Sequence, residues 1–186
     1  MSSDKRYVVG YDLNDYLTQI SYLELNNDEP ETLMSDAESP RMGIPTLLCK
    51  RKQVSQWSFG LEARKLIDSE GEAEVSKLLS LAVDGKSLVI EGESFNGLDL
   101  LILFVRKSMN MLNSVIESEQ IEQLVFTVPT LNKEMLAVLE RLAVAVPVPR
   151  DRILFQSYDE SVYHYMIHQS SELWENEVAV FDNDVL

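Results

Sequence analysis

The amino-acid sequence predicts an α/β fold in which helices flank a mixed β-sheet. Two observations lead to this prediction: the N-terminal residues have the pattern of an antiparallel hairpin, and the last third of the chain alternates strand-like and helix-like segments. A length of 186 residues suits one domain, and 45% hydrophobic with 25% charged residues is an ordinary globular composition. We therefore expect residues 1–186 to form a single lobe.

The hairpin is expected from two β-rich segments, residues 6–13 (RYVVGYDL) and 15–25 (DYLTQISYLEL). In the second segment, β-branched and aromatic residues stand between polar ones, which is typical of a strand with one buried face. Asn and Asp are frequent in tight turns, so the chain is expected to reverse at residues 13–15.

The middle of the chain is predicted to hold short strands followed by helices. Strand-like segments follow two acidic, turn-rich stretches, and from residue 61 the residue choice becomes helical. Residues around 35–95 are expected to form a small subdomain within the lobe. The predicted elements are strands at 44–50, 53–60 and 86–92, and helices at 61–69, 72–83 and 97–118.

The last third of the chain predicts parallel strands joined by helices. Strands are expected at 123–129, 152–158 and 177–182, with helices at 132–146 and 159–169 between them. A β-α-β-α-β order requires crossover connections, which are right-handed in nearly all parallel sheets. This order predicts a parallel half of the sheet next to the N-terminal hairpin.

The net charge of −15 argues against a nucleic-acid partner, because affinity for polyanions comes from lysine and arginine. The same charge repels a free nucleotide, so an ATP site would need backbone N–H groups and Mg²⁺. A single cysteine, Cys49, and an N-terminus without an apolar stretch favour the cytoplasm. The most apolar run, residues 98–105, is shorter than the roughly 20 residues of a membrane span, so no membrane association is expected.

Several motifs resemble the actin and DnaK-type chaperone ATPase superfamily. The opening VVGYDLNDYLTQISYLEL is similar to the family's first hairpin, WSFGLEARK to a Gly-x-x-Ala-Lys helix start, and LVFTVP to a strand ending in Thr-Val-Pro. The final EVAVFDND looks like the strand that enters the family's second phosphate turn. The resemblance implies a ribonuclease-H-like lobe, with a second lobe or a protein partner outside these residues completing the cleft.

By this resemblance, the first turn would hold ATP and Mg²⁺. Asp12 would bind Mg²⁺ through water, and Asn14 and Asp15 stand where phosphate oxygens would lie. The family has Gly-Thr-Thr where this chain has Asn14, Asp15 and Tyr16, so a carboxylate and a bulky ring replace small residues. Both replacements oppose phosphate binding.

Further site residues are implied by the same resemblance. Arg64 stands for the lysine that contacts the γ-phosphate, and Gln156 for the residue that positions the attacking water. Asp182 lies in the second turn, followed by Asp184 in place of a glycine. An Mg²⁺ site would require Asp12, Asp182 and Asp184 to gather around the ion.

Three functions stay open at this point. The first is a degenerate or weakly nucleotide-binding assembly module, and the second is a working Mg²⁺-ATPase lobe whose conformation switches with nucleotide. The third is a metal-dependent hydrolase, for which His164, His168 and Glu160 have helical spacing. The two histidines do not match the metalloprotease signature, because that signature has Glu directly after the first histidine and this chain has Tyr165 there. The acidic residues at 28–38 and 68–74 are expected to be solvated loops.

Overall fold

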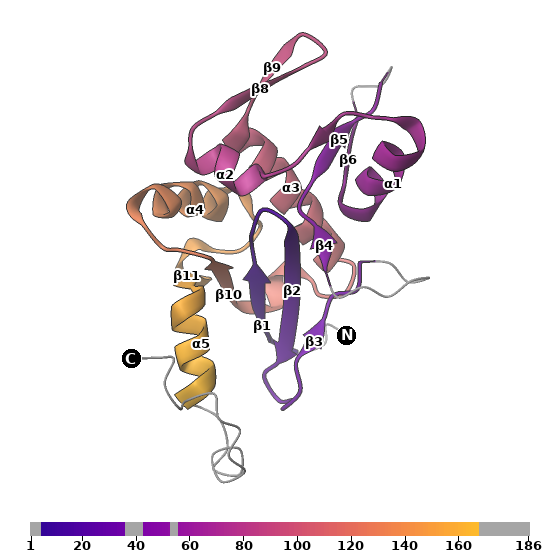
Figure 1. Ribbon diagram of the computed structural model, residues 1–186. Helices are drawn as coiled ribbons and strands as arrows, with labels where there is room; N and C mark the ends of the chain where they lie inside the picture. Colours follow the sequence, from indigo (N-terminus) through magenta and orange to yellow (C-terminus); the bar gives the residue numbers. More distant parts are fainter. Residues whose placement is uncertain (1–4, 36–42, 53–55, 168–186) are drawn as a thin grey trace, which may run out of the picture.

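A mixed β-sheet forms the centre of the computed structural model, which describes residues 5–35, 43–52 and 56–167 (Figure 1). The strand order is β11-β10-β1-β2-β3, and β4 also pairs with β2. β1 is antiparallel to β2 and parallel to β10, and β10 is parallel to β11. The α/β class and the mixed sheet are therefore confirmed. The strands are β1 (Tyr7–Asp12), β2 (Leu17–Glu24), β3 (Glu31–Thr32), β4 (Ile44–Pro45), β10 (Ile121–Val128) and β11 (Ile153–Ser157).

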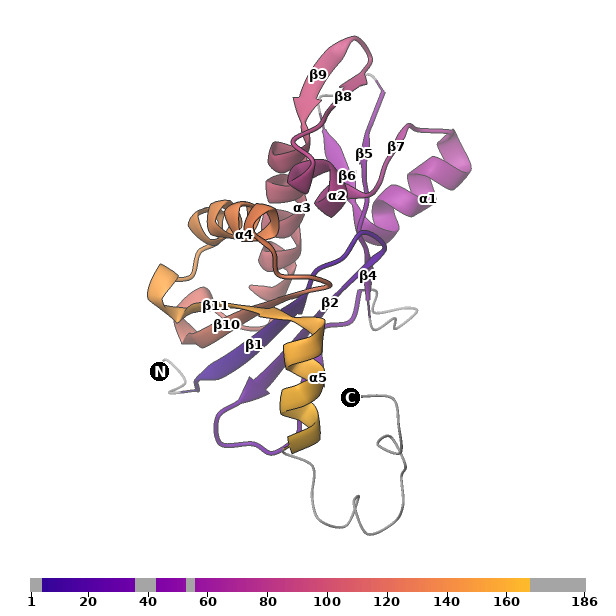
Figure 2. The same ribbon diagram turned by 60° about the vertical axis from the view of Figure 1, so that its left-hand side comes forward.

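Two helices cover one face of this sheet, and a third lies on the other side (Figures 1 and 2). α3 (Gly97–Leu112) and α4 (Lys133–Ala145) begin at asparagine caps, because Asn96 accepts the N–H of Leu98 and Asn132 accepts that of Met135. α5 (Tyr158–Ile167) follows β11 directly. Among the described residues, no helix is long and apolar enough to span a membrane.

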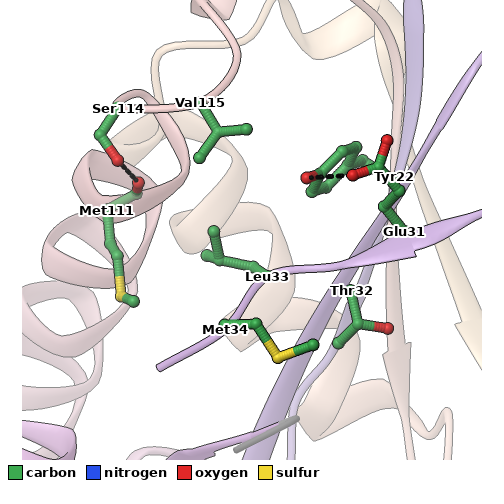
Figure 3. Close-up of a pocket in the computed structure, with 8 residues that line it drawn as sticks. All are labelled: Tyr22, Glu31, Thr32, Leu33, Met34, Met111, Ser114 and Val115. Atoms are coloured by element: carbon green, nitrogen blue, oxygen red, sulfur yellow. Dashed lines mark hydrogen bonds between the residues drawn. The ribbon is translucent and has the colours of Figure 1, made fainter. Parts of the chain in front are cut away.

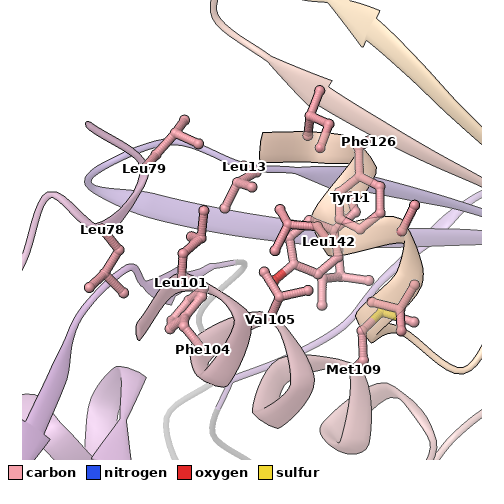
Figure 4. Close-up of a cluster of buried hydrophobic side chains, with 14 of the residues drawn as sticks. Tyr11, Leu13, Leu78, Leu79, Leu101, Phe104, Val105, Met109, Phe126 and Leu142 are labelled. Atoms are coloured by element: carbon pink, nitrogen blue, oxygen red, sulfur yellow. The ribbon is translucent and has the colours of Figure 1, made fainter. Parts of the chain in front are cut away.

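The hydrophobic core lies between the sheet and the helices α3 and α4 (Figure 4). Alternation along the strands sends Tyr11 and Phe126 into this core, where their ring centroids are 5.0 Å apart. Phe104 of α3 is fully buried in the same cluster. The Tyr11 hydroxyl makes a buried hydrogen bond of 2.5 Å with Ser108 of α3, so the one polar group on this ring has a partner.

Smaller elements lie beside the central sheet within the range expected for a subdomain. Buried Leu48 and Val75 pair with each other and join the main core. Lys50 links two of the smaller sheets, because its Nζ lies 2.5 Å from Glu93. The elements are β5 (Leu48–Lys50), β6 (Trp57–Phe59), α1 (Gly60–Glu70), β7 (Glu74–Val75), α2 (Leu78–Val83), β8 (Ser87–Ile90) and β9 (Glu93–Asn96).

The helix predicted at 72–83 was wrong in its first half. Residues 74 and 75 form β7, and the helix begins only at Leu78. Lys77 adopts a left-handed conformation with φ 56°, which interrupts any continuous helix. The side chain of Glu72 is buried and accepts the backbone N–H of Lys52 at 3.1 Å, holding this stretch in an extended form.

The long helix predicted at 97–118 ends earlier, at Leu112. Asn113 accepts a hydrogen bond from Ser118, and the hydroxyl of Ser114 donates to the Met111 carbonyl at 2.7 Å. Such side-chain bonds compete with helix continuation. The 3₁₀ turn η1 (Ser118–Gln120) then leads into β10.

The alternating order β10, α4, β11, α5 agrees with the prediction from the last third of the sequence. A second 3₁₀ turn, η2 (Arg150–Arg152), precedes β11. The strand expected at 177–182 lies outside the described residues.

Candidate functional site

The turn between β1 and β2 uses its own side chain to satisfy its backbone. The Oδ1 atom of Asn14 accepts the N–H groups of Tyr16 and Leu17 at 2.9 and 3.0 Å, and its Nδ2 donates to the Leu17 carbonyl. Asparagine is well suited to such a turn. The N–H of Leu13 donates to the Thr127 carbonyl at 2.9 Å. Three of the backbone donors in this turn are therefore occupied within the protein.

Asp15, at the tip of the same turn, caps α2. Its carboxylate accepts the backbone N–H of Ser80 at 3.0 Å and also the hydroxyl of Ser80. The residue before α2 is Lys77, whose side chain supplies no cap. Because helix N-termini favour negative charge and need acceptors for free N–H groups, Asp15 supplies from another element the cap that α2 lacks.

Asp12, the last residue of β1, is held by a tyrosine from the far end of the chain. The hydroxyl of Tyr158 donates to Oδ1 of Asp12 at 2.6 Å, and Asn14 donates to the same hydroxyl at 3.2 Å. Burial, followed by the hydrogen bond to Asp12, raises the pKa of Tyr158 to about 12. Tyr158 therefore stays protonated and continues to donate at neutral pH.

Strand register brings four polar residues into one row across the sheet. Asp12 pairs with Gln19 on β2 and with Thr127 on β10, and Thr127 pairs with Gln156 on β11. Paired residues on neighbouring strands point to the same face. Tyr11, the neighbour of Asp12, points into the core, so the polar row lies on the opposite face.

A cavity of about 490 Å³ opens on this polar face. Gly10 lines it, and a Cβ atom at that position would meet only the Ser21 carbonyl, at 4.0 Å. Val162 of α5 supplies apolar surface. The polar lining consists of Asp12, Gln19, Ser21, Thr127, Tyr158 and Ser161.

The structure gathers only some of the residues expected at a nucleotide site. Asp12 lines the cavity, whereas Gln156, which belongs to the same polar row, does not line it. Arg64 is not brought to the cavity, since its guanidinium pairs with Glu74 of β7 at 2.9 Å. Asp182 and Asp184 lie outside the described residues.

Metal ligation finds no support in the part of the chain that the structure describes. No group of three His, Cys, Asp or Glu side chains there could hold an ion. Glu160 belongs instead to a capping box, accepting the N–H of Ser157 at 2.8 Å while the Ser157 hydroxyl accepts the N–H of Glu160. His168 lies outside the described residues, and His164 stacks edge-on near Tyr163.

Cys49 is a buried free thiol in β5. Burial raises its pKa, helped by nearby Glu72 and Glu62, so the reactive thiolate is disfavoured. A structural role in the interior fits this environment.

A second cavity, of about 510 Å³, lies between the β2–β3 edge and the end of α3. Figure 3 shows Met111 and Val115 on one side and Leu33 and Met34 on the other. Methionine side chains adapt to varied apolar partners. The hydroxyl of Tyr22, which also lines this cavity, donates a hydrogen bond to Glu31 at 3.1 Å. The sequence patterns did not predict the cavity.

Three residues that complete the first cavity were not predicted as site residues from the sequence. Tyr158 and Ser161 come from α5, and Thr127 from β10. Thr127 belongs to the Thr-Val-Pro segment, which the family resemblance singled out as the end of a strand. Nothing local marks Tyr158, whose partner Asp12 is 146 residues away along the chain.

Residues 29–185 match the model of a protein family described as "Family of unknown function (DUF5716) C-terminal". The matched range includes β10, β11 and α5 and begins after the β1–β2 hairpin. No curated protein matches the chain.

Proposed function

The chain belongs to the DUF5716 C-terminal family, and we propose that it is a ribonuclease-H-like lobe of the actin and chaperone ATPase type that acts as an assembly module. The strand order supports this proposal. Three antiparallel strands, β3, β2 and β1, continue into the parallel strands β10 and β11. In such a lobe, the turn after β1 would be the phosphate-binding turn.

One observation supports the proposal most strongly: polar groups of this turn already form hydrogen bonds within the protein. Asn14 accepts the N–H groups of Tyr16 and Leu17, which would otherwise be available to a phosphate, and both carboxylate oxygens of Asp15 accept hydrogen bonds from Ser80. A phosphate bound here would meet the negative charge of Asp15 and few available donors. We therefore expect nucleotide binding to be weak or lost, and ATP hydrolysis not to be the function.

Apolar side chains on α5 and β11 support a role in assembly. Exposed apolar groups gathered on one element are typical of a surface that meets another protein. Only Met166 of α5 is buried. The exposed apolar residues of these two elements are Leu154, Val162, Tyr163, Tyr165 and Ile167.

A cytoplasmic location is part of the same proposal. The one cysteine is a free, buried thiol, as is usual for proteins of reducing compartments.

A working ATPase lobe remains the second candidate, because Asp12 keeps one oxygen available. Tyr158 uses Oδ1 only, and Oδ2 accepts no hydrogen bond from the described residues. A water-mediated Mg²⁺ ion could use that oxygen.

Calorimetric titration with ATP and Mg²⁺ separates these two candidates, with Asp12→Ala as the control. No binding at about millimolar nucleotide, equivalent to less than about 4 kcal/mol of binding free energy, is expected for the assembly module. Micromolar binding that Asp12→Ala abolishes would overturn the proposal in favour of the ATPase lobe.

A further inference from the structure

The cavity beside Asp12 has an unusual balance of charge. Its lining contains one carboxylate together with hydroxyl and amide groups, and none of the described lining residues is Lys, Arg or His. The whole chain carries a net charge of −15. Such a cavity attracts cations and repels phosphate.

Within the described part of the chain, Asp12 has no ionic partner. None of the ion pairs among the described residues involves Asp12, and its only hydrogen bond there comes from neutral Tyr158. The side chain is half-buried, and its Oδ2 accepts no hydrogen bond from any residue that the structure describes. A partly desolvated carboxylate gains most from a donor that also carries positive charge.

The surrounding groups favour an organic cation over a metal ion. A Ca²⁺ or Mg²⁺ site uses several oxygen ligands, often more than one carboxylate, and Asp12 is the one carboxylate among the described lining residues. A guanidinium presents five N–H donors in a plane and needs several acceptors. The carboxylate of Asp12 and the hydroxyl oxygens of Thr127 and Ser161 are acceptors of that kind.

The rim of the cavity adds apolar contact for neighbouring residues of a ligand. Val162 lines the cavity and is exposed, and Tyr165, three residues further along α5 on the same helix face, is exposed as well. An arginine flanked by apolar residues would use both the carboxylate and this helix surface.

We propose that the cavity formed by Asp12, Thr127 and Ser161 receives an arginine side chain from a basic partner protein, whose apolar neighbours contact α5. This inference rests on the proposed assembly function and names the partner chemistry of that module. The net charge of −15 would favour the approach of such a basic partner.

The test is a titration of the isotope-labelled 186-residue chain with the peptide acetyl-Leu-Arg-Leu-amide, followed by amide NMR shifts. The matched probe replaces arginine by citrulline, which has nearly the same shape without the charge. We expect saturable shifts at Gly10, Thr127 and Ser161, with the citrulline peptide binding at least about tenfold more weakly, as loss of a charge-assisted bond predicts.

Two variants make the result specific. Asp12→Asn keeps an acceptor for Tyr158 but removes the charge, and Gly10→Val fills the cavity floor in a strand that tolerates β-branched residues. Both should weaken arginine-peptide binding about tenfold or more. Asp159→Asn, an exposed carboxylate of α5 outside the cavity lining, makes the same change in net charge and should bind like the unmodified chain.

Equal binding of the two peptides, or unchanged binding by Asp12→Asn, would overturn the inference. Shifts of the same amides by a neutral sugar but not by the arginine peptide would overturn it as well. Tight binding of Mg²⁺ and ATP in the calorimetric titration would overturn the proposed function instead, so the two failures are distinguishable.

Discussion

Asp15 and Ser80 join the β1–β2 turn to the first turn of α2 across 65 residues of sequence. The carboxylate accepts the backbone N–H of Ser80 at 3.0 Å as well as its hydroxyl. The residue expected to disturb phosphate binding therefore has a positive structural role. It fixes the turn to a helix that has no cap of its own.

Replacing Asp15 by alanine should lower the free energy of unfolding by about 1 kcal/mol, the usual effect of losing an N-terminal helix cap. Urea unfolding followed by circular dichroism measures this change. Asp15→Asn keeps an acceptor and should cost less. Asp28→Ala removes an exposed loop carboxylate and serves as the control; an equal loss in both alanine variants would contradict the capping role.

Gly97 is required by close packing at the start of α3. A Cβ atom there would lie 2.7 Å from the carbonyl group of Leu81 and 2.8 Å from the Lys86 oxygen, and these backbone atoms cannot easily move. Gly97→Ala should destabilise the protein by about 2 kcal/mol through overpacking. Gly10→Ala is the matched control, since its nearest neighbour is 4.0 Å away. Equal urea midpoints for the two variants would contradict this prediction, because they would show that the backbone at Leu81 and Lys86 moves aside at no cost in stability.

Four strands of the sheet, β1, β2, β10 and β11, could be predicted from the sequence because their signals are local, whereas β3 falls in an acidic stretch that was expected to be a loop. Alternating residues mark β1 and β2, and the turn residue Asn14 lies between them. The segment 72–83 shows where a local pattern fails. Val75 has helical spacing with the leucines after it, yet it pairs with Leu48 in a strand, and left-handed Lys77 separates the two parts. Tertiary pairing overrode the periodicity.

The candidate site was only partly predictable, because contacts between distant parts of the chain decide which residues meet there. Asp12 was identified through the family resemblance of the first hairpin, but the hydrogen bond from Tyr158 joins residues 146 positions apart. Arg64 was expected at the phosphates and instead pairs with Glu74, ten residues away. Local spacing indicates which residue types are present, whereas the register of β10 and β11 decides which of them meet.

The buried pair Tyr11 and Ser108 allows a direct measurement of one core hydrogen bond. Tyr11→Phe removes the hydroxyl and keeps the ring, while Ser108 still donates to the Val105 carbonyl at 2.9 Å. The expected loss is about 1 kcal/mol in the free energy of unfolding, with a coupling of similar size to Ser108→Ala in a double-mutant cycle. Tyr22→Phe removes a more exposed hydroxyl from β2 and should have little effect. Additive single and double variants would contradict a direct interaction.

The capping box of α5 should make this helix sensitive to acid. The N–H of Ser157, followed by its hydroxyl, lowers the pKa of Glu160 below the ordinary value of 4.5. A lowered pKa in the folded protein means that the stabilising contribution is complete above the ordinary value and is lost as the pH falls through the folded pKa. Carboxyl ¹³C shifts measured during an acid titration report the pKa of Glu160 directly.

Ser157→Ala should raise the pKa of Glu160, because it removes the hydroxyl that donates to the carboxylate at 3.1 Å. The backbone N–H at 2.8 Å remains, so the rise should be partial. In Glu160→Gln, the amide does not titrate, and amide exchange in α5 should lose the acid dependence that the capping box confers. A pKa of Glu160 at or above 4.5 in the unmodified chain would contradict the box, since a carboxylate that accepts backbone N–H bonds favours its charged form.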